Sequence, residues 1–567
     1  MAGRLADFGA LWPAERRLAA WIRAGNREEC VISPGLPPED APREHRLRAS
    51  FLRALALGGF EDCLVSEKGL RVVGAHVEGD GPEAAETRGL DLGGCNLGAD
   101  LALIACRFPD PVLLRGAALR SLFLNGSALM AGFGADRLDA QGGVFLRGVV
   151  AEGAVRLLGA KLGGNLSATD TRFTGREGEV AFSADRLEAK GGVFLHGVAA
   201  EGEVRLLGAK LGGNLSATDA RFTGREGEVA FSADRLEAKG GVFLRGVAAE
   251  GEVRLPGAKL GGDLSLHGAT LTPGKDGRAL SLDGAHVSGA LFLRAGAKLL
   301  GTLGLSAAEI GTIVDAEASW PRRLILDRCR YGGFAGGAPV GAAARIRWLS
   351  LQDGAYADGD FRPQPWEQCA RALREAGHSA AAREVLVEKE KRQRRARREE
   401  LRRAYLFEDA YWHAIWDTVL GATIRYGRQP LLAFAWLAGF LALGTGVFAT
   451  AESFGALKPN LPQIQRAEEW VGCDENGALR GDFPTQYGCY LDRPQARSYP
   501  RFNAFVYSAD TLFPVVGLEM QSYWLPDERI PVGKFARYYL WLHIAMGWAL
   551  TLLAVAGFSG LVKQDST

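Results

Sequence analysis

A 49-residue repeat constrains the fold of this chain more than any other feature of its sequence. The segment ADRLDAQGGVFLRG begins at Ala135, and close copies of it begin at Ala184 and Ala233. The segment TGREGEV recurs at the same interval, at Thr174 and Thr223. Self-similarity at a fixed period is typical of solenoids, in which each repeat buries its apolar face only against its neighbours.

Short apolar segments and glycine-rich corners alternate within each repeat. Segments such as GVFLRG and EVRLLG alternate apolar and polar residues, as strands covered on one face do. The elementary unit is therefore about half a coil: a short strand, a glycine corner and a second strand. The apolar positions that we align recur at 24 or 25 residues at Leu162, Leu187, Leu211, Leu236 and Leu260. A later series recurs at 12 and 11 residues, at Val287, Leu299 and Ile310.

We therefore predict a mainly β fold, a right-handed β-helix or solenoid over residues 63–355, with the clearest duplications at 136–282. The 75 glycines, about one residue in eight, suit a chain with many tight corners. Residues 1–62 carry amphipathic helical patterns. We expect them to form a helical cap over the first coil, because an open strand edge invites pairing with another chain.

Charge and cysteine usage exclude several classes of protein. The 67 basic and 66 acidic residues nearly balance, so the overall charge indicates no polyanionic partner. The eight cysteines are spread widely and include no CxxC pair, unlike a disulfide-dense secreted module or a common zinc site. The first 25 residues are charged throughout and lack the apolar core of a signal peptide. We expect this part of the chain in the cytoplasm.

Residues 362–404 predict a helix hairpin of tetratricopeptide style, broken at Gly377, whose second helix is strongly basic. A solvated helix face would explain the charges, but we favour contact with anionic lipid because a membrane span follows closely. No aromatic residues are interleaved with the charges, so we expect no nucleic acid. The basic residues are Lys389, Lys391, Arg392, Arg394, Arg395, Arg397, Arg398, Arg402 and Arg403.

Residues 405–567 predict a membrane domain with two transmembrane helices, at 429–451 and 538–562. Each segment exceeds the roughly 20 apolar residues that a spanning helix needs. The basic helix before the first span places both termini in the cytoplasm and residues 452–537 outside. Cys473 and Cys489 are the two cysteines of this outer loop. We expect a disulfide between them, because the outer compartment is oxidising.

The apolar segment 502–524 of the outer loop admits two interpretations. Phe502–Leu518 carries one charge, and the segment is too short and too polar for a comfortable span. A re-entrant helix would give the layout of a two-helix channel subunit. An amphipathic helix on the outer surface is the alternative that we prefer. In the channel interpretation the ion path is lined by Asp510, Thr511, Pro514, Gly517 and Glu519.

Over nearly its whole length the chain resembles a bacterial family catalogued as membrane-associated oxidoreductases. The resemblance rests on PAERRL, GEVRLLGAKLGGNLSATDARF, PWEQCARALREAGHSAAAREVL, RYGRQPLLAFAWL and VYSADTLFPVVGLEMQSYWLP. At Arg425 and Arg428-Gln429 the chain departs from the GYGYRP-like run that is usual there. The repeats are also similar to pentapeptide repeats, although the strict five-residue register is absent. The resemblance implies a multi-pass protein of the bacterial inner membrane.

The family name implies redox chemistry, but the sequence has no GxGxxG between a strand and a helix, no CxxCH and no cluster-type run of cysteines. We therefore expect no cofactor, no metal and no catalytic residue. The leading hypothesis is a non-enzymatic, membrane-anchored scaffold or sensor, whose solenoid binds a cytoplasmic protein. One alternative is an oligomeric ion channel with two transmembrane helices per subunit, gated by the solenoid. The other, from the family name only, is a membrane-associated oxidoreductase.

Overall fold

The computed structural model describes residues 3–79, 89–225, 228–354, 360–404, 406–426, 429, 431–473, 483 and 485–558. The chain divides into two compact units, unit 1 (Met1–Lys389) and unit 2 (Glu390–Thr567). The boundary between them falls within helix α5 (Ser379–Arg403). Unit 1 is built on short parallel strands, and unit 2 is built on long apolar helices.

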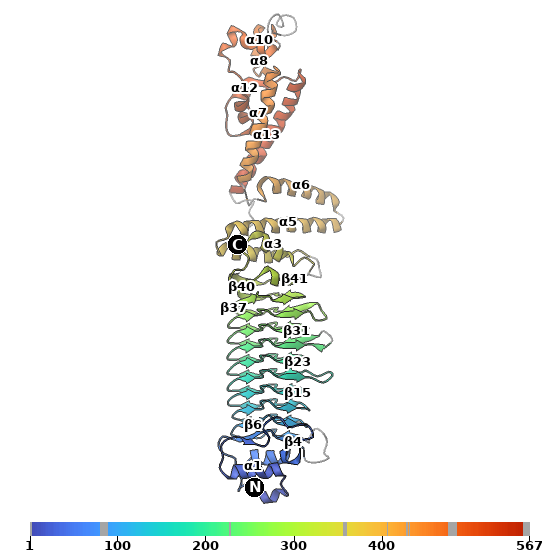
Figure 1. Ribbon diagram of the computed structural model, residues 1–567. Coiled ribbons are helices and arrows are strands. Elements are labelled where there is room, and N and C mark those ends of the chain that lie inside the picture. The colour runs from blue at the N-terminus through green and yellow to red at the C-terminus, as the bar shows by residue number, and fades with distance from the viewer. Residues whose placement is uncertain are drawn as a thin grey trace. The chain divides into compact units, whose positions relative to one another are not determined.

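Unit 1 is a solenoid-like stack of parallel strands (Figure 1). A typical coil has four strands, such as β17 (Lys161–Leu162), β18 (Leu166–Ser167), β19 (Arg172–Thr174) and β20 (Phe182–Ser183). In the described part of the chain the first two belong to a 20-stranded sheet, and the other two belong to separate 11-stranded sheets.

The first strands of successive coils lie side by side in the 20-stranded sheet. From residue 118 onward they are β9 (Ala118–Leu119), β13 (Asp139–Ala140), β17, β21 (Glu188–Ala189), β25 (Lys210–Leu211), β29 (Glu237–Ala238), β33 (Lys259–Leu260), β37 (His286–Leu293), β40 (Glu309–Asp315) and β42 (Arg330–Phe334). The two other sheets run from β2 (Arg46–Arg48) to β38 (Lys298–Leu299) and from β5 (Leu90–Asp91) to β41 (Arg323–Ile325).

The 49-residue repeat of the sequence consists of two coils of unequal length. Leu162 pairs with Ala189, and Ala189 pairs with Leu211, so that successive coils take 27 and 22 residues. The longer coil has its extra residues in the loop between β19 and β20, which contains the TGREGEV segment. The predicted alignment of Leu162 with Leu187 is therefore wrong by two residues.

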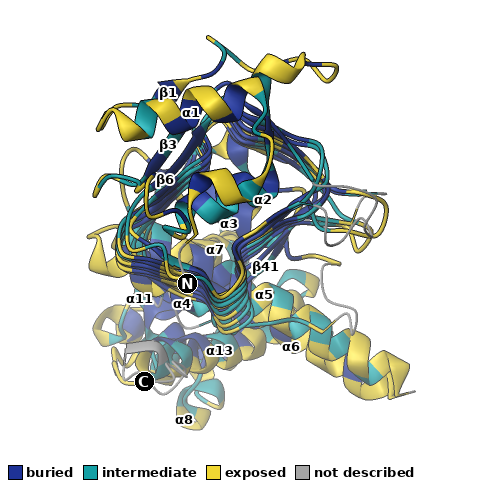
Figure 2. Cartoon of the chain, turned by 90° about the horizontal axis from the view of Figure 1, so that it is seen from below, coloured by how far each residue is buried: buried dark blue, intermediate teal, exposed yellow. Residues whose placement is uncertain are grey.

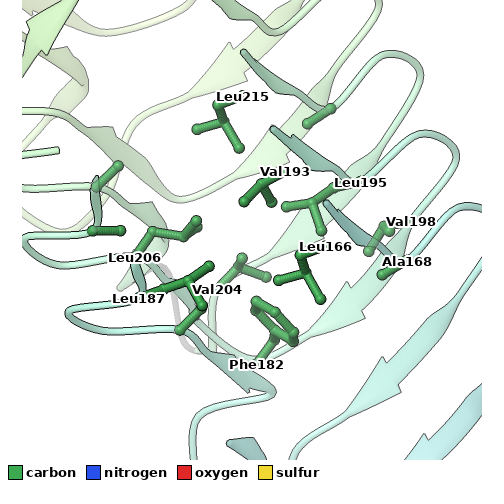
Figure 3. Packing of buried hydrophobic residues seen from close by; sticks show 14 of the residues in the cluster. Leu166, Ala168, Phe182, Leu187, Val193, Leu195, Val198, Val204, Leu206 and Leu215 are labelled. Carbon is green, nitrogen blue, oxygen red and sulfur yellow. The ribbon is translucent and has the colours of Figure 1, made fainter. Parts of the chain in front are cut away.

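Columns of apolar side chains fill the interior of the stack. Figure 3 shows Leu166, Val193 and Leu215 from three successive coils, and these residues are register partners. In the first strands leucine alternates with alanine, at Ala140, Leu162, Ala189, Leu211, Ala238 and Leu260. Because a large side chain lies between two small ones, the coils approach to the usual strand spacing of about 4.8 Å without crowding.

The corner after the first strand requires glycine in every second coil. A Cβ atom on Gly212 would lie 2.1 Å from the carbonyl oxygen of Lys190, and one on Gly163 would lie 1.9 Å from that of Gln141. The alternate coils carry Lys190 and Lys239 at the same position. The two-coil period therefore follows from backbone contacts that admit a side chain here only on alternate coils.

The N-terminal end of the stack begins earlier than the sequence predicts. Strands β1 (Cys30–Val31) and β2 already pair in parallel with later strands, so the predicted boundary at residue 62 is wrong. Helices α1 (Pro13–Arg23) and α2 (Ala49–Ala56) lie across this end of the stack (Figure 2). Their buried side chains, including those of Leu18 and Phe51, belong to the core of the stack.

The stack also ends earlier than predicted, because β42 is its last parallel strand and residues 342–350 form helix α3 (Ala342–Ser350). Helix α4 (Gln364–Glu375) follows and, with α5, forms the predicted hairpin around Gly377. Helix α4 packs on β42, where the side-chain amide of Gln368 donates to the carbonyl oxygen of Tyr331 at 2.6 Å. The last coil is thus covered by helix rather than left open.

A buried ion pair holds α3 against the last coils. The guanidinium of Arg345 donates two hydrogen bonds to the carboxylate of Asp315, at 2.7 and 2.8 Å. Both side chains are at most 1% exposed. The indole N–H of Trp320 donates to the same carboxylate at 2.7 Å, and the guanidinium carbon lies 3.6 Å from the centre of the Phe334 ring. The buried charges of Arg345 and Asp315 are therefore paired and hydrogen-bonded.

We expect Asp315→Asn to lower the free energy of unfolding of the full-length protein by about 3–5 kcal/mol, because Arg345 would stay buried without a counter-charge. The matched control is Glu317→Gln. Glu317 pairs with Arg347 at 2.7 Å, but these side chains are 46% and 59% exposed. That change should cost at most about 1 kcal/mol. Thermal unfolding in detergent measures both variants, and equal losses would contradict the assignment.

Unit 2 contains three long helices, α6 (Phe407–Ile424), α7 (Leu431–Ser453) and α13 (Pro531–Phe558). By length and composition, α7 and Pro531–Ala556 of α13 can cross a membrane. Helix α7 begins two residues after the start of the first predicted span, and α13 begins seven residues before the start of the second predicted span. Residues 559–562 of the second predicted span lie outside the described residues. Helix α6 was not predicted from the sequence.

The segment between α7 and α13 is folded. Strand β43 (Leu457–Pro459) pairs antiparallel with β44 (Trp524–Pro526) and brings the two ends of the segment together. Buried aromatic side chains, among them Trp470, Tyr490 and Trp524, form its core. The remaining helices are α8 (Pro462–Gln465), α9 (Glu468–Val471), α10 (Gln486–Asp492), α11 (Ala504–Leu512) and α12 (Met520–Tyr523).

Candidate functional site

A groove of about 1190 Å³ follows the first strands of the coils from β13 to β37. The glycine corner forms part of its wall, since Gly163, Gly212 and Gly261 line it. The absence of side chains at these corners leaves room along the stack, while charged residues project beside it. The groove therefore depends on the corner glycines that recur in every second coil.

One column of side chains alternates in charge from coil to coil as far as Lys259, and its members from Asp139 to His286 line this groove. Adjacent members are register partners, about 4.8 Å apart along the stack, so each charge from Lys161 to Glu237 has an opposite charge on both sides. The ammonium of Lys259 lies 3.2 Å from the carboxylate of Glu237. Opposite charges in register stabilise the correct pairing of the coils. This charge ladder consists of Asp139, Lys161, Glu188, Lys210, Glu237, Lys259, His286, Glu309 and Arg330.

Two further lysines, Lys190 and Lys239, line the groove beside the charge ladder. They occupy the corner position at which the alternate coils carry glycine. With them the lining has five lysines against three carboxylates, those of Asp139, Glu188 and Glu237. The ladder charges neutralise one another in part, and the two extra ammonium groups leave the groove positive. It is suited to an extended ligand that carries negative charge.

The structure brings Ser288, His286 and Glu309 together near one end of the groove. The hydroxyl of Ser288 lies 3.3 Å from Nε2 of His286, and Nδ1 of His286 lies 3.2 Å from the Glu309 carboxylate. The order is that of a nucleophile, a base and an orienting acid. The N–H groups of Gly289 and Ala290 are already bonded to the preceding coil, and all three side chains are exposed. The cluster therefore lacks the preorganised donors that acyl transfer needs, and we assign it to the ladder.

A second hollow, of about 400 Å³, lies beside the long loops and is rich in carboxylates. Burial raises the pKa of Glu203 and of Glu252, while the nearby Arg205 and Arg254 guanidinium groups act in the opposite direction. Within the described ranges no three acidic, histidine or cysteine side chains converge to hold a metal ion. The carboxylates of this hollow are therefore not arranged to coordinate a metal ion.

In unit 2, α11 packs against both α7 and α13. The hydroxyl of Ser508 donates to the carbonyl oxygen of Leu441 at 3.1 Å. Leu441 lies ten residues into α7, or about 15 Å along the helix, near the middle of that candidate span. Leu512 at the end of α11 packs with Leu437 and Leu550. Helix α11 therefore lies against the middle of both candidate spans, and its position relative to a membrane stays a prediction.

A polar network joins α11 to the middle of α13. His543 is fully buried, with Nε2 3.2 Å from the Ser508 hydroxyl and 3.1 Å from the Ser508 carbonyl oxygen. The hydroxyl of Tyr539 lies 3.1 Å from Nδ1. With the Nε2 proton in place, Nε2 donates to Ser508 and Nδ1 accepts from Tyr539, so both ring nitrogens are satisfied. Such complete pairing offsets the cost of burying a polar group among apolar side chains.

Three of the predicted ion-path residues have structural roles in α11 or in the return segment, residues 513–519, that follows it. The carboxylate of Asp510 accepts the N–H groups of Leu518 and Gln521, at 2.7 and 2.8 Å. Thr511 donates to the carbonyl oxygen of Tyr507 within the helix. Pro514 follows the end of the helix and cannot continue its hydrogen bonding.

Two predicted residues remain exposed in this return segment, namely Gly517 and Glu519. Val515 and Val516 beside them are 86% and 48% exposed. The five predicted residues are therefore close in sequence, but within one chain the structure does not gather their side chains around a common path.

The basic helix α5 divides its charges between internal pairs and the surface. Lys389 is only 5% exposed and pairs with Glu367 at 2.9 Å, so its predicted contact with lipid is wrong. Arg394 and Arg398 both pair with Asp417 of α6. Of the nine predicted basic residues, Arg392 is intermediate in exposure, and the five exposed ones are Lys391, Arg395, Arg397, Arg402 and Arg403.

The segment between α7 and α13 contains a disulfide between Cys473 and Cys489, whose Cα atoms lie 5.9 Å apart. Both cysteines are nearly buried, and Phe483 packs against them. The bond links α10 to the residues that follow α9. It therefore closes part of the aromatic core that lies between β43 and β44.

We expect Gly547→Ala to separate α11 from α13. A Cβ atom at this position would lie 1.9 Å from the carbonyl oxygen of Leu512. The clash should lower the free energy of unfolding in detergent by about 1–3 kcal/mol. Gly439→Ala in α7 is the matched control, since a Cβ atom there meets nothing within 4 Å. Thermal unfolding of the full-length variants measures both, and unchanged stability of the Gly547 variant would contradict the packing.

No protein-family model, no curated protein and no solved structure matches the chain. The family resemblance drawn from the sequence motifs therefore stays a prediction. The function has to be argued from the residues of the groove and of unit 2.

Proposed function

We propose that the chain is a membrane-anchored scaffold or sensor whose solenoid groove binds an extended acidic segment of a cytoplasmic protein. The observation that carries this proposal is the charge ladder with its two additional lysines, Lys190 and Lys239. Repeated charges along one line recognise an extended chain, because successive groups of the ligand meet successive coils.

The dimensions of the groove support an extended ligand. It follows seven first strands, from β13 to β37, which span about 29 Å at 4.8 Å per coil. About nine residues of extended peptide, at 3.3 Å each, cover that length. Acidic side chains of such a peptide would pair with the lysines, and its basic or neutral positions would face the carboxylates. Complementary charge of this kind favours specificity and fast association.

Membrane anchoring is the second part of the proposal. Helices α7 and α13 would span the inner membrane of a bacterium, with both termini in the cytoplasm, because the basic helix α5 precedes the first span. The disulfide between Cys473 and Cys489 agrees with an outer location of the intervening segment. The solenoid itself would wind right-handed, as nearly all parallel crossovers do, with α1 and α2 as its cap.

Photo-crosslinking from position 239 tests the groove. We expect full-length protein with a benzoylphenylalanine in place of Lys239 to crosslink an acidic segment of a cytoplasmic protein in cells. Adding Lys190→Glu should reduce the crosslinked fraction about tenfold or more, since one charge pair lost and one repulsion gained exceed about 1.4 kcal/mol.

The matched control places the photo-crosslinker at Arg221, with Arg172→Glu as the second change. Both arginines are exposed in another sheet, and they lie one 49-residue repeat apart, as the two lysines do. A crosslink at position 221 equal to that at position 239 would overturn the groove as the binding surface. So would a crosslink at position 239 that is unaffected by Lys190→Glu.

A specific observation favours an oligomeric ion channel as the second candidate. Helix α11 packs between two candidate spans, and the exposed residues 515–519 of the return segment follow it. In a closed ring this segment would surround the axis, and Glu519 would supply a ring of carboxylates. Native mass spectrometry together with conductance in bilayers tests this candidate. A monomer without conductance would remove it, and a tetramer or pentamer whose conductance falls with Glu519→Gln would support it.

A further inference from the structure

Helix α6 presents a stripe of exposed apolar side chains. Tyr411, Trp412, Ile415, Trp416 and Val419 are 39–67% exposed. At 100° per residue they fall within an arc of about 140° on one side of the helix. Two tryptophans and a tyrosine on such a stripe are typical of helices that lie at the boundary between a membrane and water.

The opposite side of α6 is fixed to the basic helix α5. Asp417 is 5% exposed and accepts a hydrogen bond from Arg394 at 2.7 Å, while Arg398 pairs with its other oxygen. The guanidinium of Arg394 also lies 4.9 Å from the centre of the Tyr426 ring. Asp417 is about 170° around the helix from the middle of the apolar stripe. The stripe therefore points away from α5, and the buried carboxylate is matched by two guanidinium groups.

Helix α6 also contacts both candidate spans, near the start of α7 and near the end of α13. Leu420 packs with Ala433, near the start of α7, and with Ala554, near the end of α13. The indole N–H of Trp436 donates to the carbonyl oxygen of Ala422 at 3.0 Å. A membrane that is crossed by α7 and α13 has its surface where α7 begins and α13 ends. That surface is the level of α6.

We propose that α6 lies in the headgroup region of the membrane, with its apolar stripe on the acyl chains. Helix α5 then lies about one helix diameter, some 10 Å, further from the acyl chains, at the level of the lipid phosphates. Its exposed Arg395, Arg397, Arg402 and Arg403 contact anionic headgroups there. The ion pairs of Asp417 hold the two layers together. This inference rests on the membrane anchoring in the proposed function.

Fluorescence quenching in proteoliposomes tests the position of α6. Full-length protein carries Cys95→Ser, since Cys95 is the one free cysteine that is not buried. One reporter cysteine is then added at Ile415 or at Val419 and labelled with bimane. Vesicles of phosphatidylcholine and phosphatidylglycerol contain lipids with a nitroxide either near the headgroup or near the chain end. We expect headgroup nitroxides to quench both reporters about twofold or more relative to chain-end nitroxides.

Two controls separate the possible results. His413→Cys is exposed on the flank away from the stripe and should be quenched less than either reporter. Leu443→Cys, at an exposed position in the middle of α7, should be quenched most by chain-end nitroxides. Absence of quenching at Leu443 would overturn the anchoring itself. Quenching at Leu443, with none at Ile415 or Val419 beyond that at His413, would overturn the placement of α6 alone. Protection of both α6 reporters from lipid and from a water-soluble quencher would show a protein contact and would equally overturn it.

Discussion

Each coil of the stack is stable only because another coil lies on it. A single coil has four short strands and no sheet of its own, so its backbone groups and its leucines are satisfied only by the coils above and below. The in-register pairing of Leu162 with Ala189, and of Lys161 with Glu188, serves the core and the charge ladder at once. A slip by one residue would turn apolar side chains outward and break both columns. The helices at the two ends follow from the same constraint, because the terminal coils have one open face.

The repeat, the strands and the glycine corners could be predicted from the sequence, because they depend on local periodicity. The register could not. The spacing of leucines suggested that Leu162 stacks on Leu187, whereas unequal coil lengths place Ala189 there. The loop of the longer coil contains the extra residues, and no local pattern shows how many residues of a coil lie in its loop rather than in its strands. The ends of the stack were misjudged for a related reason, since apolar residues in a covering helix resemble those of another strand.

In unit 2 the composition predicted the two long helices, but their contacts had to come from the structure. The channel interpretation, which the sequence did not favour, placed Asp510 on an ion path because the segment lies between two predicted spans. Its carboxylate instead holds the backbone at Leu518 and Gln521. Helix α6 escaped notice because its apolar residues merge with the span that follows. The sign that would have found it is the spacing of Tyr411, Ile415 and Val419, together with an acid on the opposite side of the helix at Asp417.

The groove contains two kinds of charged residue, those that the pairing of the coils constrains and those that it leaves free to vary. The ladder charges are constrained by their partners in neighbouring coils, so a change in one leaves two like or unpaired neighbours. Lys190 and Lys239 have no such constraint, because the coils on either side carry glycine at that corner. Their side chains can change in charge or length without altering the register of the stack. In the proposed function, recognition of a ligand could therefore be tuned at alternate coils, while the ladder preserves the surface of the groove.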